Sequence, residues 1–189
     1  MEKENKINVF EREDFRKWLE KNHEKENKVL IILHKKHTGK PAPSHRQQIE
    51  EAICFGWIDT TLKRIDENTY QRKFVKRNKN STWSNNTISY AKELTKQGKM
   101  FPQGTYFYKL GLSKPTHDHG IPKNPDMPLE LKKALNKKEN KQAKENFNNF
   151  APSTKKATYR LLLRAKLPET KKKRINTIIN LALENKKVF

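Results

Sequence analysis

Two indoles, one carboxylate and one guanidinium stand close together in this sequence, and such side chains can hold a small molecule. Trp57 and Asp59 are two positions apart, and Trp83 follows Arg77 after five residues. If the stretch forms a β-hairpin, side chains two positions apart share a face, and Asp59 is expected to meet Arg77 as a diagonal pair. The group is then either the floor of a pocket for a small anionic or planar ligand, or a partly buried ion pair held by aromatic packing.

Spacing alone favours the ion pair held by aromatic packing, and a ligand site is the second hypothesis. The predicted ligand-binding residues belong to the hairpin and the loop that follows it. They are Trp57, Asp59, Lys63, Phe74, Arg77, Trp83 and Ser84.

The same hairpin is rich in cations, which gives a second hypothesis. Its basic residues interleave with Tyr70 and Phe74, and aromatic rings beside phosphate-seeking cations bind single-stranded nucleic acid without reading its bases. Four more cations open the last predicted helix, where they oppose the helix dipole and point to an acidic partner. A solvated sheet face and a coding bias toward Lys explain the pattern equally well. The residues of this alternative are Arg64, Arg72, Lys73, Lys76, Lys171, Lys172, Lys173 and Arg174.

Nucleophiles and metal ligands are sparse. Cys54 is the single cysteine, and no motif pairs its thiol with one of the histidines before it, His34, His37 and His45. A free cysteine without a base is most often a small buried hydrophobe.

The clustered residues His117, Asp118 and His119 lack further ligands at a metal-site spacing, so we expect solvated loop residues there. The patterns GxGxxG, P-loop, HExxH and GxSxG do not occur. The sequence therefore predicts no catalytic residue, no metal and no cofactor, and a small enzyme of unknown reaction stays open as an alternative.

Charge is the most unusual property of this 189-residue chain. Lys and Arg number 42 against 21 Asp and Glu, which gives a net charge of +21 and an isoelectric point near 10.0. Residues 1–29 are neutral, whereas residues 130–189 hold 17 basic and five acidic side chains. Such an excess attracts anionic small molecules, acidic proteins or nucleic acid.

The remaining composition indicates a cytoplasmic protein of one domain. The mean hydropathy is −1.08, yet three Trp, five Tyr and nine Phe are too many for a disordered chain. No apolar run approaches the roughly 18 residues of a membrane span, and the first ten residues lack the apolar stretch of a secretory signal. The oligomeric state is not predicted.

Periodicity predicts an α+β fold. Helices are expected over 13–22, 45–55, 85–97 and from Pro102, and strands over 28–36, 57–65 and 69–77. Ser44 and Ser84 read as N-caps and Gly56 as a helix stop, and Ser153 is expected to cap a later helix. A small antiparallel sheet of about three strands then packs with helices in a core of residues 1–111. A Pro/Gly loop follows over 112–127, and a helical section over 128–189 packs on the core.

Four segments in a fixed order carry a family resemblance. They are CFGWID at 54–59, YQRKFVKRNKNSTWS at 70–84, GKMFPQG at 98–104 and RAKLPET at 164–170. In this order the chain resembles the YdeI/OmpD-associated, or bacteriocin-protection, family from about Phe10 to Lys187. Thr60 stands where the family usually has Gly, and Val75 and Lys76 stand where it usually has Thr and Pro.

The resemblance implies a role but no reaction. Members are linked to protection from bacteriocins and antimicrobial peptides and to an outer-membrane porin. We therefore expect a non-enzymatic binding protein of stress protection with a site for a small anion or planar ligand.

Overall fold

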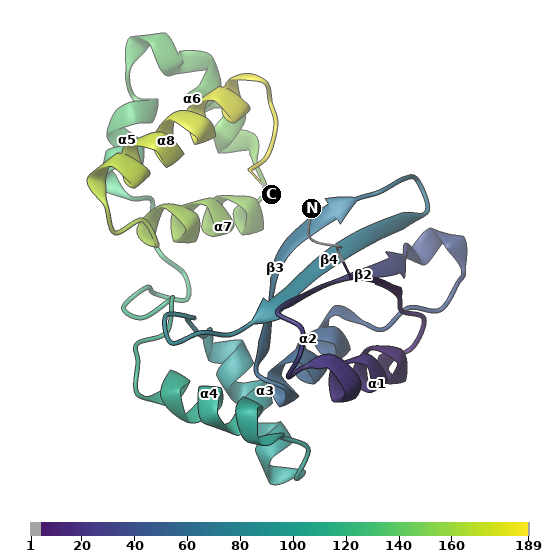
Figure 1. Cartoon of the computed structure of the whole chain (residues 1–189). Helices are drawn as coiled ribbons and strands as arrows, with labels where there is room; N and C mark the ends of the chain where they lie inside the picture. Colours follow the sequence, from purple (N-terminus) through teal and green to yellow (C-terminus); the bar gives the residue numbers. More distant parts are fainter. Residues whose placement is uncertain (1–4, 189) are drawn as a thin grey trace. The chain divides into compact units, whose positions relative to one another are not determined.

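The computed structural model describes residues 5–188, which form two compact units (Figure 1). The N-terminal unit ends at His117 and the C-terminal unit begins at Asp118, inside the segment 112–127 where Pro and Gly predict a loop. Packing of the helical section on the core stays a prediction. In the part of the chain that the structure describes, no helix is long and apolar enough to cross a membrane.

The N-terminal unit combines a sheet with helices, and the predicted α+β class is confirmed. Its elements are β1 (Lys6–Asn8), α1 (Arg12–Asn22), β2 (Lys28–His34), the short 3₁₀ helix η1 (Lys36–Thr38), α2 (His45–Cys54), β3 (Trp57–Arg64), β4 (Thr69–Lys76), α3 (Asn85–Lys96) and α4 (Pro102–Leu112). The predicted helix and strand boundaries agree with the structure to within two residues, and β1 and the 3₁₀ helix η1 are additional elements that were not predicted.

The sheet is mixed, with the strand order β1-β2-β4-β3. β2 and β3 both pair antiparallel with β4, as the hairpin signal predicts, but β1 pairs parallel with β2. The predicted small antiparallel sheet of about three strands is present as β2, β4 and β3, and β1 adds a fourth, parallel strand that was not predicted. β1 spans only three residues and pairs with a distant segment, so it leaves no local pattern in the sequence.

Helices α1 and α2 lie on one face of the sheet (Figure 1) and close the core of the N-terminal unit. Alternation along β4 places Phe74 on this face, where its ring meets Phe15 of α1. The predicted capping box of α2 is present, with Ser44 and Gln47 each bonding the backbone of the other. Gly56 ends α2 with φ +74°, a conformation that glycine adopts without strain.

The C-terminal unit is entirely helical within the described residues. It contains α5 (Leu129–Leu135), the 3₁₀ helix η2 (Lys138–Asn140), α6 (Lys141–Asn149), α7 (Pro152–Leu163) and α8 (Pro168–Leu183). Its apolar core includes Leu131, Phe147, Leu162 and Ile178. Ser153 is not the cap of α7, because the helix begins one residue earlier with Pro152, and Ala151 occupies the cap position.

Candidate functional site

A cavity of about 240 Å³ lies at the base of the β3–β4 hairpin, within the N-terminal unit. Apolar side chains of α2 form one wall, and the start of β3 and the loop after β4 form the others. The residues that line it are Ile49, Ala52, Ile53, Trp57, Ile58, Asp59, Arg77, Thr82, Ser84, Thr87 and His117. Sequence reasoning found Trp57, Asp59, Arg77 and Ser84 but missed the others, since nothing in the sequence brings α2 and His117 to the hairpin.

Arg77 is a buried cation on the wall of this cavity. The residue is 5% exposed, and its guanidinium donates to the backbone carbonyls of Trp57 (3.3 Å) and Thr82 (3.2 Å). Among the described carboxylates, none forms an ion pair with it. Burial lowers the pKa of Arg77 to about 10, although the charge of Asp59 raises it in part. The side chain therefore remains a cation at neutral pH, without a carboxylate of its own.

Trp83 holds the guanidinium from one side. The Arg77 carbon Cζ lies 3.8 Å from the centre of the Trp83 ring, a close cation–π contact. Gly111 of α4 makes room for this indole, because a side-chain carbon at Gly111 would lie 2.5 Å from the Trp83 ring. Two elements far apart in sequence thus fix the orientation of Arg77.

Asp59 does not pair with Arg77, and that prediction is wrong. Its Oδ2 accepts a hydrogen bond of 2.8 Å from Arg72 and lies 3.9 Å from Nε2 of His45. The reason is register: Asp59 stands opposite Phe74, so its same-face diagonal neighbours in β4 have even numbers, and Arg72 is one of them. Burial and the charge of Arg72 lower the pKa of His45, although the neighbouring Asp59 raises it in part.

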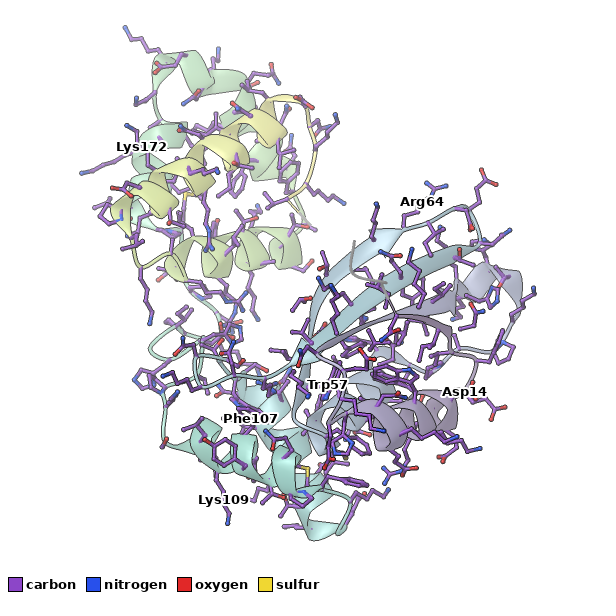
Figure 2. The ribbon with its side chains drawn as sticks, viewed as in Figure 1. Asp14, Trp57, Arg64, Phe107, Lys109 and Lys172 are labelled. Atoms are coloured by element: carbon purple, nitrogen blue, oxygen red, sulfur yellow. The ribbon has the colours of Figure 1, made fainter. Side chains whose placement is uncertain are left out.

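Trp57 lies between the sheet and the helices (Figure 2) and is fully buried. Its ring meets Trp18 of α1 edge to face at 5.7 Å, and its Nε1 has no hydrogen-bond partner among the described residues. An indole N–H that is buried without a hydrogen-bond partner is unfavourable.

Of the other predicted ligand-binding residues, one lines the cavity and two do not. Ser84 lines the cavity and caps α3 in a capping box with Thr87. Phe74 is buried in the core and does not line the cavity. Lys63 is exposed near the far end of β3, so the structure does not bring it to the others.

The cations of the nucleic-acid alternative do not form one surface on the hairpin. Arg72 is paired with Asp59 on the helix-covered face, Lys73 alternates to the opposite face, and Lys76 donates to the backbone of Glu24. Arg64 is exposed at the opposite end of β3 from Trp57 (Figure 2).

The basic run of α8 is also partly used within its own unit. Lys171 pairs with Glu130 at 2.7 Å, and Arg174 donates to the carbonyl of Leu161. Lys172 and Lys173 are exposed.

Cys54 is a buried thiol that is unsuited to nucleophilic chemistry. It is 0% exposed, and burial together with the charge of Glu51 raises its pKa to about 12. Only the thiolate attacks, so this cysteine is unreactive near neutral pH.

The expectation of solvated loop residues is wrong for Asp118, whereas His117 and His119 are exposed as expected. His117 lines the cavity, and Asp118 of the C-terminal unit pairs with Arg160 (2.8 Å) and Arg164 (2.6 Å). Within the described residues, no three His, Cys, Asp or Glu side chains gather as metal ligands would.

Comparison with known protein families divides the chain in the same way as its fold. Residues 7–106 match a family described as a domain of unknown function, DUF8412, and this match covers more than half of the chain. The chain belongs to the DUF8412 family. Residues 124–185 match the family described as bacteriocin-protection, YdeI or OmpD-associated, which confirms the predicted resemblance for the C-terminal unit. No curated protein and no solved structure matches the chain.

The two matches also show where the resemblance resides. The segment RAKLPET lies inside the bacteriocin-protection match, whereas CFGWID and YQRKFVKRNKNSTWS lie inside the DUF8412 match. All residues that line the Arg77 cavity, apart from His117, lie inside the DUF8412 match.

Proposed function

We propose that the N-terminal unit binds a small organic anion with an apolar body, and that the chain acts as a non-enzymatic binding protein in bacteriocin protection. The observation that carries the binding proposal is Arg77, a buried cation on a cavity wall that forms no ion pair with a described carboxylate. Asp59 of the same cavity attracts it at longer range but is itself paired with Arg72. The bacteriocin-protection match of residues 124–185 supports the wider role.

Electrostatics favour an anion at Arg77. Two carbonyl groups and one indole face orient the guanidinium but do not neutralise it. A buried charge without a counter-ion is unfavourable, and a ligand carboxylate supplies that charge in a low-dielectric setting, where the attraction is strong. Ser84 adds a hydroxyl group on the same wall.

The rest of the cavity favours an apolar ligand body. Ile49, Ala52 and Ile53 of α2 face the space beside Trp57 and Ile58. A volume of about 240 Å³ suits a small ring rather than a nucleotide or a peptide. An aromatic carboxylate fits both ends of the site.

A panel of matched compounds tests the proposal by ligand-observed NMR. Benzoate has the charge and the ring, benzamide keeps the ring without the charge, and acetate keeps the charge without the ring. We expect benzoate to bind and the other two to bind at least roughly tenfold more weakly, since each lacks one of the two interactions. Equal signals from benzoate and benzamide would contradict a role for the cation.

Variants locate the binding in the chain. Arg77→Gln removes the cation, whereas Arg64→Gln changes an exposed arginine at the other end of β3 as the matched control. Thr82→Phe, at an exposed lining position, narrows the cavity while keeping the cation and the backbone carbonyl that Arg77 bonds, and it keeps the test valid if Arg77→Gln does not fold. We expect Arg77→Gln and Thr82→Phe to abolish the benzoate signal and Arg64→Gln to retain it.

A further inference from the structure

The C-terminal unit has a groove of its own, distinct from the Arg77 cavity. It measures about 420 Å³ and lies between the start of α5 and the start of α8. The residues that line it are Glu130, Lys166, Pro168, Lys171, Lys172 and Ile175. Lys166 and Pro168 come from the RAKLPET segment, so the connection between α7 and α8 forms part of the wall.

The rim of this groove is positive. Its one carboxylate, Glu130, is neutralised by Lys171 at 2.7 Å. Lys166 and Lys172 are exposed (Figure 2 labels Lys172), and neither forms an ion pair with a described residue. Two cations at the rim therefore lack an ion-pair partner among the described residues of this unit.

The floor and the surroundings of the groove are apolar. Pro168, Ile175 and the aliphatic stems of the lysines supply carbon surface to its wall. Leu129 and Leu167, next in sequence to the lining residues Glu130 and Pro168, are 61% and 63% exposed. Large side chains this open are common singly, but beside an apolar groove they indicate a binding surface.

From this combination we propose that the groove binds an acidic protein segment that inserts an apolar side chain between α5 and α8. The carboxylates of the segment meet Lys166 and Lys172, and its apolar side chain contacts Ile175 and Pro168. Charge complementarity selects the acidic flanks, and the concave apolar floor selects a protein over nucleic acid, which offers phosphates but no aliphatic side chain.

Fluorescence anisotropy with the full chain and three dye-labelled probes tests the proposal. The first probe is a peptide of glutamates around a central Leu-Leu-Trp, the second is a polyglutamate peptide of equal charge, and the third is oligo-dT. We expect the first probe to bind at least roughly tenfold more tightly than the polyglutamate, because only the first has an apolar anchor. Equal affinity for the two peptides, or tighter binding of oligo-dT, overturns the proposal.

Substitutions then assign the binding to the groove. Lys166→Glu and Lys172→Glu reverse the rim charge, and Leu167→Ser removes an exposed apolar side chain that the fold does not need. Lys138→Glu makes the same charge change at an exposed lysine of η2 that does not line the groove. We expect each rim reversal to weaken the first probe by roughly tenfold and Lys138→Glu by less than about twofold. Equal losses at Lys138 and Lys172 would mean diffuse attraction to the whole basic unit and would overturn the groove.

Discussion

The two units of this chain differ in whether charged side chains are buried in them. In the N-terminal unit, Glu51 is 1% exposed and accepts hydrogen bonds from Arg12 and Arg16 of α1, and Arg77 is 5% exposed. In the C-terminal unit, the one buried polar side chain among the described residues is Thr158, whose hydroxyl bonds the carbonyl of Thr154. Many of the lysines of that unit lie at its surface.

This difference separates structural charge from charge that is available to partners. Glu51 joins α1 to α2, because its carboxylate bridges two arginines of the neighbouring helix. Arg77 is oriented as firmly but lacks a carboxylate, which makes it the exception within its own unit. The surface lysines of the C-terminal unit attract anionic partners from solution, and dissolved salt screens this attraction.

Alkylation of Cys54 gives the largest expected effect. Because burial raises its pKa from 9.0 to about 12, the thiolate fraction near pH 8 falls roughly a thousandfold below that of an exposed cysteine. We expect iodoacetamide to modify the denatured chain at an ordinary rate and the native chain at least roughly a hundredfold more slowly. The folded pKa exceeds the unfolded one, so the stability from this thiol is present below about pH 9 and is lost as the pH rises toward 12.

A cysteine in the C-terminal unit serves as the control for this experiment. Ser153 is exposed near the start of α7, so Ser153→Cys in a Cys54→Ala chain should react at the rate of the denatured protein. Fast native alkylation of Cys54 would mean that the N-terminal core opens readily.

Removal of the buried carboxylate comes next in size. Glu51→Gln leaves Arg12 and Arg16 facing a neutral side chain, so we expect the free energy of unfolding of the N-terminal unit to fall by about 3 kcal/mol. Urea denaturation followed by Trp fluorescence measures this, since the three tryptophans lie in that unit.

Glu145→Gln is the matched change at an exposed glutamate of α6, and its cost should stay below about 0.5 kcal/mol. If both variants lost the same stability, buried charge would not distinguish the units.

The smallest expected effect is the loss of stability when a capping serine is removed. The sequence predicts both Ser84 and Ser153 as N-caps, and only Ser84 is one in the structure. Ser84 caps α3 through the backbone N–H of Thr87, so Ser84→Ala should cost about 1 kcal/mol. Ser153 lies inside α7 and caps nothing, so Ser153→Ala should change the stability by less than about 0.5 kcal/mol. Thermal unfolding of both variants measures the difference, and a larger loss at Ser153 would be inconsistent with Pro152 as the first residue of α7.

Local signals predicted most of the fold because they act within a few residues. The capping pairs at Ser44 and Ser84, the stop at Gly56 and the alternation along 69–77 each use a chemical preference that needs no distant partner. The same reasoning failed at Ser153, because α7 begins one residue earlier at Pro152 and Ala151 occupies the cap position. It also missed β1, whose three residues depend on β2 for every strand contact.

The candidate site was predicted in its residue types but not in its pairing. Four of the predicted ligand-binding residues line one cavity, namely Trp57, Asp59, Arg77 and Ser84, whereas Lys63, Phe74 and Trp83 are not among its lining residues. Ligand binding at this cavity stays a prediction. A diagonal contact of Asp59 with Arg77 requires Asp59 to stand opposite Val75, whereas it stands opposite Phe74. A shift of one residue moves a side chain to the other face of a strand. Asp59 therefore forms its ion pair with Arg72, and Arg77 makes a cation–π contact with Trp83.

The sequence by itself determined most of the elements and the excess of cations, since composition and short-range periodicity encode these directly. The likeness of residues 124–185 to a protection family rests instead on a motif resemblance that includes RAKLPET. Only the tertiary structure decided which cations are neutralised. In the sequence nothing distinguishes the cations Arg72, Lys171 and Arg77 from one another. An ion pair forms only where the packing of distant segments brings a carboxylate within a few ångströms, as it does for Arg72 and Lys171. For Arg77 the fold supplies an indole and two carbonyl groups instead.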